Sequence, residues 1–452
     1  MRASTYKTYL VILLMTVLAF NYVDRLALGL VLQGIKTDLH LTDTELGVLS
    51  GIAFALFYSV MGLPIARWAD RGNRVTIIAL TTAVWSVMVA LCGVAMSFVQ
   101  LMAIRIGVGV GEAGCLPPAN SLIAEYFSRA ERPRATAIYL QGTNVSLILA
   151  YFVAGWLSQF YGWRVMFMLI SLPGFALAVV VVLTIREPRR AKSRIDKEDK
   201  CPSADPLTDN IPSPVQSNLK DTLVILWANV TFRHLLYALS VFYFFAYGIL
   251  QWQPAFFVRS FGLETGELGT WFASIYGVGG ILGTYWGGAL ACRYAPNNER
   301  AQLRAMAVVN AVFNGAVWSL IYFTQNQYLA FALMGLSTMG GAAINGPLYA
   351  TIQTLVPAHM RAVSIALILL FANLIGMGLG PLAVGVLSDV LHPLFRQESL
   401  RYALLALCPG YLWTSWHLWQ ASKSVIRDLE IVKDNIPDAP RANASGETCV
   451  TS

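Results

Sequence analysis

Long apolar runs, each bounded by glycine, proline or clustered charge, alternate with short polar connections along nearly the whole chain. Each run approaches the roughly 20 residues that a helix needs to cross a bilayer, so the pattern predicts a helical membrane protein. Prolines within several runs need not end them, because neighbouring helices can satisfy the freed backbone groups. We expect twelve membrane-spanning helices, near residues 9–32, 46–67, 75–96, 99–123, 135–158, 164–186, 233–257, 268–291, 304–324, 328–352, 362–388 and 400–420.

One long polar stretch interrupts this pattern near the middle of the chain. Residues 187–232 are rich in charge, proline and serine, a composition typical of flexible linkers. We therefore predict an all-α architecture of two six-helix bundles, residues 1–186 and 233–421, joined by this linker. Residues 422–452 begin as an amphipathic segment and then become polar, so they are predicted to form a tail.

The composition places the chain in a membrane rather than in water. Of its 452 residues, 56% are hydrophobic and only 13% are charged, and the mean hydropathy is +0.57. The net charge of +7 therefore does not indicate a nucleic-acid partner. Lys and Arg gather in alternate connections, which is the pattern of loops that stay in the cytoplasm. Both termini, the linker and the tail are predicted to be cytoplasmic.

Several kinds of chemistry find no support in the sequence. The six cysteines lie far apart, most of them in apolar runs, so we expect no disulfide framework, no metal site and no cofactor. No Ser-His-Asp set or nucleotide motif stands out, which argues against an enzyme and against catalytic residues. The first apolar run is too long for a signal-peptide core, so it is kept as the first helix.

Corresponding connections in the two halves look alike. The connection after the second helix reads ARWADRGNR at residues 66–74, and the one after the eighth reads GALACR at residues 288–293. Six plus six helices related by such a repeat resemble the build of the major facilitator superfamily. The resemblance implies that Asp70, Arg71 and Arg74 belong to a gating loop that holds the cytoplasmic faces of the two halves together in one state. The first copy departs from the family motif by an alanine where glycine is usual, and the second copy has lost its acid.

Three further segments narrow the resemblance. NYVDR at residues 21–25, RIGVGVGEAG at 105–114 and NLIGMGLGP at 373–381 resemble the spinster branch of that superfamily. The branch includes proton-linked carriers of lysophospholipids and sphingoid lipids. The same Asp-Arg and Arg…Glu pattern occurs in sugar-acid symporters of the anion:cation branch, so the motifs indicate a mechanism more narrowly than a substrate. The family fold implies a monomer, and the short loops fit a bacterial inner membrane.

Four ionisable residues lie deep within the predicted helices: Asp24, Arg25, Arg105 and Glu112. A charge at mid-bilayer costs at least about 2.5–3.5 kcal/mol, so the four are expected to face a wet cavity or one another. Arg105 and Glu112 are two helical turns apart and share one helix face. Asp24 and Arg25 are about 100° apart around their helix, and we expect Asp24 to point at the cavity.

A carboxylate whose surroundings alternate between wet and dry can take up and release a proton. The family resemblance assigns this coupling role to Asp24 and Glu112, with Arg25 and Arg105 as charge partners or anion-binding groups. Arginine keeps its proton, and its planar fork suits a carboxylate or a phosphate. The alternative is a static ion network that only fixes helix packing.

Uncharged polar and aromatic side chains at mid-helix depth are candidates for the wall of a substrate cavity. Tyr247 and Gln251 share a face of the seventh predicted helix, one turn apart. The glycines of RIGVGVGEAG recur at small-xxx-small spacing, which predicts close helix contacts and not a dinucleotide loop. The candidate cavity residues are Tyr22, Tyr58, Gln141, Asn144, Tyr247, Gln251, Tyr276, Asn345 and Asn373.

Together these features predict a proton-coupled secondary transporter that moves a small organic anion or an amphipathic lysolipid or sphingoid substrate by alternating access. The first half would bind protons and an anionic headgroup, and the second half would bind the less polar part of the substrate. One alternative is a sugar-acid or aromatic-acid proton symporter. Another is an uncoupled lipid scramblase or a receptor. The partners would be the substrate, protons and membrane lipid.

Overall fold

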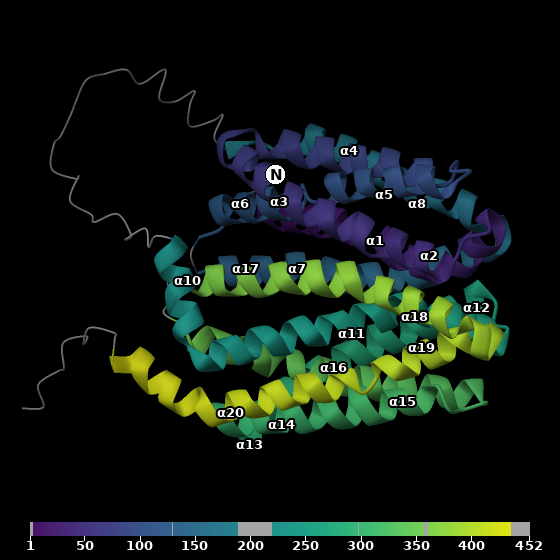
Figure 1. Ribbon diagram of the computed structural model, residues 1–452. Coiled ribbons are helices and arrows are strands. Elements are labelled where there is room, and N and C mark those ends of the chain that lie inside the picture. The colour runs from purple at the N-terminus through teal and green to yellow at the C-terminus, as the bar shows by residue number, and fades with distance from the viewer. Residues whose placement is uncertain (1–2, 129, 189–218, 297, 357–359, 435–452) are drawn as a thin grey trace, which may run out of the picture.

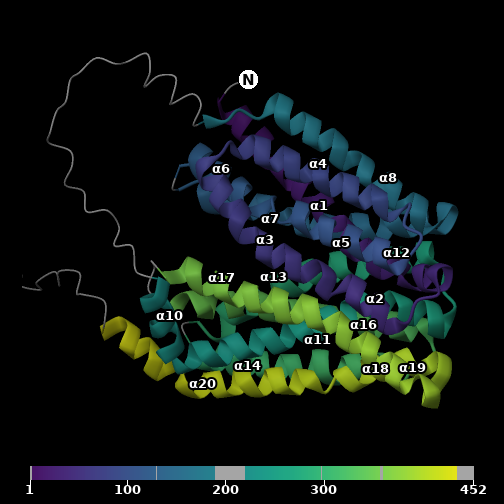
Figure 2. The ribbon, with the colours of Figure 1, turned by 45° about the horizontal axis from the view of Figure 1, so that its top comes forward.

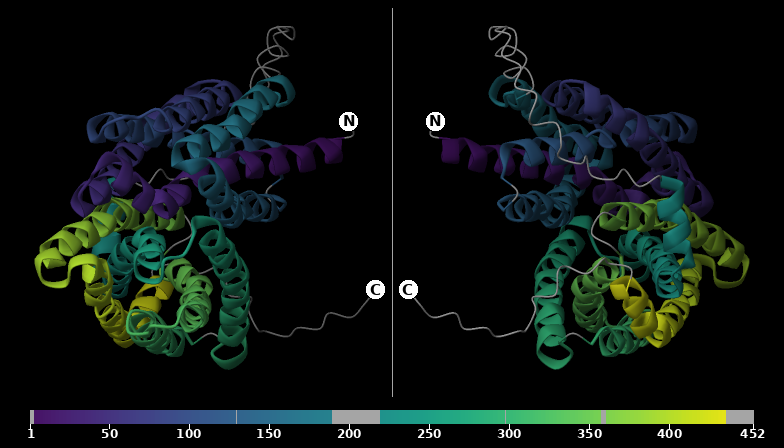
Figure 3. Two further views of the ribbon diagram at one scale, coloured as in Figure 1. Left: turned by 90° about the vertical axis from the view of Figure 1, so that its right-hand side faces the viewer. Right: turned by 90° about the vertical axis from the view of Figure 1, so that its left-hand side faces the viewer.

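The computed structural model describes residues 3–128, 130–188, 219–296, 298–356 and 360–434, which are helical almost throughout. The first half of the chain forms the upper part of the molecule in Figure 1 and the second half the lower part, and Figure 3 shows the two parts from their ends. The helices of the first half are α1 (Ala3–Leu39), α2 (Asp43–Ser50), α3 (Ile52–Arg71), α4 (Arg74–Cys92), α5 (Phe98–Glu112), α6 (Leu116–Tyr126), α7 (Arg132–Ile148) and α8 (Ala154–Thr184). Those of the second half are α10 (Leu219–Ala228), α11 (Val230–Phe261), α12 (Thr265–Ser274), α13 (Gly280–Tyr294), α14 (Glu299–Val309), α15 (Trp318–Ile321), α16 (Gln327–Thr354), α17 (Arg361–Phe371), α18 (Gly380–Phe395), α19 (Ser399–Leu407) and α20 (Gly410–Asp434). Short π-helical turns at Leu149–Val153, Ile275–Gly279, Asn310–Val317 and Ala372–Leu379 connect some of these helices without a break.

Nine helical stretches among the described residues are long and apolar enough to cross a membrane. The two longest, Arg132–Thr184 and Val363–Ile431, contain 53 and 69 residues, and each is interrupted by a residue with positive φ, Gly162 at 79° or Arg396 at 49°. Each is therefore long enough to cross twice. The stretch 265–294, which contains the predicted span 268–291, is helical but not among the nine, so the count of twelve stays a prediction. The all-α polytopic membrane architecture is confirmed.

Several helices begin at a residue whose side chain accepts a hydrogen bond from a backbone N–H of the first turn, which has no partner within the helix. Thr42 and Glu45 form a capping box at the start of α2, and Asn73 accepts a hydrogen bond from the first turn of α4. Asn229 does the same for α11, and Gly262, with φ of 68°, ends that helix in the left-handed region. These local signals fix where the chain turns between helices.

The predicted linker and tail contain more helix than their composition indicated. α10 lies within residues 187–232, and α20 continues to Asp434, past the predicted boundary at residue 422. Residues 189–218 of the linker and 435–452 of the tail lie outside the described part of the chain. The domain boundaries therefore stay predictions.

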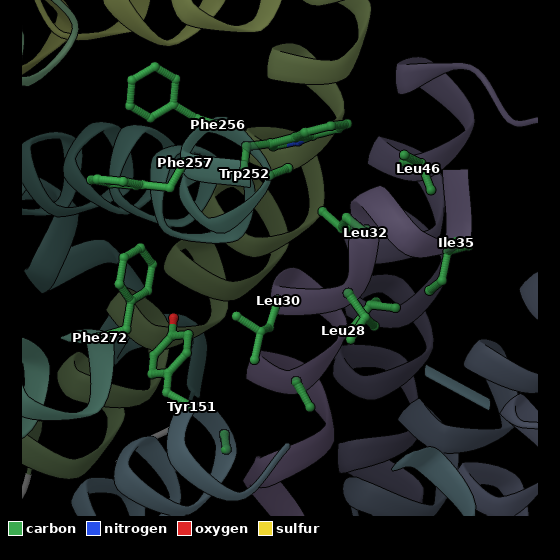
Figure 4. Close-up of a cluster of buried hydrophobic side chains, with 14 of the residues drawn as sticks. Leu28, Leu30, Leu32, Ile35, Leu46, Tyr151, Trp252, Phe256, Phe257 and Phe272 are labelled. Atoms are coloured by element: carbon green, nitrogen blue, oxygen red, sulfur yellow. The ribbon is translucent and has the colours of Figure 1, made fainter. Parts of the chain in front are cut away.

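A buried apolar cluster joins the two halves at the end of the molecule away from α10. Leu32 of α1 lies beside Trp252 of α11, with Leu28 one turn away along α1, and all three are fully buried (Figure 4). At the same end α2 packs against α18 (Figure 2). Burial of a side chain of this size stabilises a protein by about 1.5–3 kcal/mol, so this cluster holds the halves together here.

Candidate functional site

Asp24 lies on α1 with its carboxylate closed off from solvent. Its Oδ2 accepts a hydrogen bond from Arg105 Nη1 of α5 at 2.6 Å, and its Oδ1 accepts one from Trp85 Nε1 of α4 at 2.9 Å. All three side chains are at most 1% exposed. Gly111 permits this arrangement, because a Cβ there would lie 2.7 Å from the backbone nitrogen of Trp85. The predicted close contact of the α5 glycines is thus confirmed.

Arg25 and Glu112 form the second charge pair. The distance from Arg25 Nε to Glu112 Oε1 is 2.6 Å, and the Glu112 side chain is fully buried. The Arg25 guanidinium lies over three aromatic rings, with its carbon 4.3 Å from the centre of Tyr22, 4.4 Å from Phe54 and 4.5 Å from Tyr58. Its buried Nη2 has no hydrogen-bond partner among the described residues. One nitrogen of the fork is therefore left without an acceptor in the described part of the chain.

A cavity of about 190 Å³ lies beside these pairs, between the two halves of the molecule. Arg25 and Arg105 are among the residues that line it, while Asp24 and Glu112 are not. The expectation that Asp24 points at the cavity therefore differs from the structure. Trp85 of α4 and Arg105 of α5 both donate hydrogen bonds to the Asp24 carboxylate and hold it away from the wall. Arg25, the next residue on α1, lines the wall instead. The lining residues are Tyr22, Arg25, Leu26, Ser50, Phe54, Arg105, Thr143, Ser146, Leu147, Tyr247, Leu250, Gln251, Met377 and Pro381.

Of the candidate cavity residues, Tyr22, Tyr247 and Gln251 line this wall, whereas Gln141 and Asn144 of α7 do not. Those two amides are exposed and bonded to each other, with Asn144 Nδ2 donating to Gln141 Oε1 at 2.8 Å. The face of α7 that lines the cavity instead carries Thr143, Ser146 and Leu147.

Tyr58 packs on the Arg25 guanidinium behind the wall, and the other three predicted cavity residues lie elsewhere. Tyr276 donates a hydrogen bond to Gln253 Oε1 at 2.8 Å and stacks on Tyr151. Asn345 borders a small hollow within the second half, and Asn373 is half-buried in a π-helical turn. Single polar residues in apolar helices mark depth in the membrane, but their direction depends on helix rotation.

Sequence reasoning missed three contributors to the site. Phe54 packs on both guanidiniums, and Trp85 donates a hydrogen bond to Asp24. Met377 lies in the π-helical turn just before α18, and its sulfur is 3.4 Å from Arg25 Nη1. An indole within a span needs an acceptor for its N–H, which was an available signal for Trp85. Nothing in the sequence distinguishes Phe54 or Met377 from other apolar residues.

The predicted gating loop divides into exposed and buried parts. Asp70 and Arg71 are exposed in the last turn of α3, whereas Arg74 is 1% exposed at the start of α4. Arg74 forms ion pairs with Glu125 of α6 and with Glu187 just after α8. Arg74 is therefore a structural tie among three segments and not a solvated loop charge.

Replacing Arg74 by Ala should lower the free energy of unfolding by about 3 kcal/mol, because a buried carboxylate would lose its cation. Unfolding followed by tryptophan fluorescence in detergent measures this. Arg71→Ala, three residues away and exposed, is the matched control and should change stability little. Equal effects of the two variants would contradict the buried tie.

A group of charged side chains not anticipated from the sequence joins the halves at the end away from α10. Asp43, at the start of α2, accepts two hydrogen bonds from Arg259 of α11, at 2.7 and 2.8 Å, one from Lys36 at 2.6 Å and one from Ser388 at 2.6 Å. Asp389 of α18 accepts a hydrogen bond from the backbone N–H of Asp43 at 3.1 Å. We call these five residues the latch. The Arg259 guanidinium binds the Asp43 carboxylate through two parallel hydrogen bonds, and such charge-assisted bidentate pairs are stronger and more directional than a single neutral hydrogen bond.

Comparison with known proteins identifies the family to which this architecture belongs. Residues 14–381 match the family model of the Major Facilitator Superfamily. An MFS-type efflux pump of Mycolicibacterium smegmatis is 30% identical over 411 residues, which cover 90% of this chain and 91% of that protein. A probable galactarate/D-glucarate transporter of Bacillus subtilis is 24% identical over 369 residues, covering 75% of this chain and 76% of that protein.

The fold is similar to the crystal structure of a bacterial homologue of the human lysosomal transporter Spinster in an inward-facing and unoccupied conformation. The TM-score is 0.80 at 27% identity, covering 94% of this chain and 98% of that chain. The resemblance to the spinster branch is thereby confirmed. Since its family model covers most of its length, the chain belongs to the Major Facilitator Superfamily, whose members are transporters and not enzymes.

Proposed function

We propose that the protein is a proton-coupled secondary transporter that moves a small organic anion or an amphipathic lysolipid or sphingoid substrate by alternating access. The observation that carries this proposal is the charge-balanced group beside the cavity. Two carboxylates, Asp24 and Glu112, stand behind two guanidiniums, Arg25 and Arg105, which line the wall. The coupling roles follow from this balance.

With all four side chains ionised, the group carries no net charge. A bound anion would add one negative charge, and an unbalanced charge in the membrane costs at least about 2.5–3.5 kcal/mol. One proton on either carboxylate would restore the balance and release part of a guanidinium for the anion. Anion binding should therefore strengthen proton binding about a hundredfold, and by linkage the reverse holds equally.

The cavity wall supports an amphipathic substrate. The two guanidiniums suit a phosphate or carboxylate, and the rest of the wall is mainly aromatic and aliphatic, including Phe54, Tyr247 and Met377. The resemblance to the spinster branch, which includes carriers of lysophospholipids and sphingoid lipids, supports a lipid-like substrate. The similarity to the galactarate/D-glucarate transporter favours the second candidate, a sugar-acid symporter, for which Gln251 and Ser146 would supply polar contacts.

Internal pH in proteoliposomes tests the coupling and the substrate class together. A lysophospholipid, a sphingoid phosphate, a hexuronate and an aromatic acid would be added in turn, with empty liposomes as the control. We expect a substrate-dependent proton flux for one class, and competition between a lysolipid and a hexuronate separates the two candidates. If labelled lipid redistributes while no compound moves protons, the protein is an uncoupled scramblase and the proposal fails.

We further propose that the protein works as a monomer in a bacterial inner membrane, with both termini and Asp70, Arg71 and Arg74 on the cytoplasmic side. The distribution of Lys and Arg between alternate connections supports this orientation. In this orientation the latch lies on the outer side of the membrane.

A further inference from the structure

A second cavity lies within the second half of the molecule, away from the charged site. It has a volume of about 300 Å³ and lies between α13, α14 and α16. Apart from Tyr294 and Gln302, its lining side chains are apolar, and Gln302 already donates a hydrogen bond to the Ala295 carbonyl at 2.9 Å. Such a wall offers a water molecule few partners, so an apolar occupant fits better.

This cavity opens at the surface of the bundle. On α13 its wall includes Leu290, which is 49% exposed, and Tyr294, which is 73% exposed, and on α14 it includes the exposed Ala305. In a membrane this surface meets lipid chains. The cavity lies toward the end of the bundle that carries α10, where α13 ends and α14 begins (Figure 1).

Positive charge gathers at the mouth. The Arg293 guanidinium carbon is 5.6 Å from the centre of the Tyr294 ring, so this charge lies beside a residue of the cavity wall. Arg300 is exposed in the first turn of α14, whose amino-terminal end adds partial positive charge. Neither arginine forms an ion pair with any residue that the structure describes, and Glu299 is the acid in that first turn.

We propose that this cavity binds an acyl chain of an anionic membrane phospholipid, whose phosphate lies between Arg293 and Arg300. The apolar wall accounts for the chain and the unneutralised arginines for the headgroup, since basic residues at a bilayer surface attract anionic lipid. The lipid comes from the leaflet on the side of α10. The site is separate from the transport cavity and does not depend on the proposed function.

Native mass spectrometry of the full-length protein with added phosphatidylglycerol or phosphatidylcholine tests the headgroup. Wild type should retain phosphatidylglycerol in preference to phosphatidylcholine. The double variant Arg293→Gln, Arg300→Gln should bind phosphatidylglycerol roughly tenfold more weakly. The control Arg134→Gln, Arg427→Gln removes two exposed arginines elsewhere and should bind as wild type does. Equal retention of the two lipids, or an unchanged affinity in the first double variant, would overturn the proposal.

A second pair of variants tests the acyl-chain cavity. Ala305→Phe fills it and should lower phosphatidylglycerol retention, whereas Val308→Phe, exposed on the same helix but not part of the wall, should not. Soluble glycerol 3-phosphate should not compete with the lipid at equal concentration. If it competes, the site binds free phosphate and not a lipid. If Ala305→Phe retains lipid like Val308→Phe, the cavity does not hold the acyl chain, and the proposal fails.

Discussion

Replacing Asp24 by Asn should abolish substrate uptake driven by a pH gradient while substrate binding and exchange remain measurable. The amide keeps the size of the carboxylate and can still accept a hydrogen bond from Trp85 or Arg105, but it cannot exchange a proton. With Glu112 ionised, the group would then carry one positive charge, so an anion could bind without the uptake of a proton. Gradient-driven uptake into proteoliposomes and counterflow exchange, measured on the same preparation, separate coupling from binding.

Asp38→Asn is the matched control for this experiment. Asp38 is on the same helix, is exposed and pairs with Arg164 at the far end of α1, so its loss should leave uptake near the wild-type rate. Because Asp24→Asn leaves the buried Arg105 without its carboxylate, thermal unfolding of each variant should accompany the transport data. Gradient-driven uptake that survives in a folded Asp24→Asn protein would exclude Asp24 from coupling.

Replacing Asp43 by Asn should open the end of the molecule away from α10. Asp43 is 2% exposed and joins Arg259, Lys36 and Ser388, so its charge stabilises the arrangement in which the halves meet there. Losing that charge should cost this arrangement about 2 kcal/mol and change its population ratio about thirtyfold. Spin labels at the exposed positions Thr37 and Gln397, one in each half, should report a longer distance.

The same Asp38→Asn change serves as the control, because its ion pair lies at this end but within one half. It should leave the label distances as in wild type. If Asp43→Asn also leaves them unchanged, the latch does not set the conformational equilibrium, and the apolar cluster beneath it is sufficient to hold the halves together.

The sequence identified the charged group but not its pairing. Hydropathy places Asp24, Arg25, Arg105 and Glu112 at mid-membrane depth, and helical spacing puts Arg105 and Glu112 on one face. Which carboxylate meets which guanidinium depends on the rotation of α1 against α4 and α5, and that rotation is set by contacts such as Gly111 against Trp85. The sequence of one helix gives the angles between its side chains, but the direction in which each side chain points also depends on the packing of the neighbouring helices.

The same limit applies to the uncharged candidates, of which some line the cavity and others do not. Tyr247 and Gln251 share a face with each other, and that face meets the cavity. Gln141 and Asn144 share one too, but α7 turns it away and presents Thr143 and Ser146. The span boundaries fared better, because Gly162 and Arg396 break the two longest stretches close to the predicted positions.

The apolar cluster that joins the halves has a thermal consequence. If the end away from α10 opens to water during transport, side chains such as Leu28, Leu32 and Trp252 become hydrated, and hydration of apolar surface raises the heat capacity. The free-energy difference between the two conformations then depends on temperature in a curved way. A transporter built in this way works best over a limited thermal range, unless opening one end buries a matching apolar area at the other.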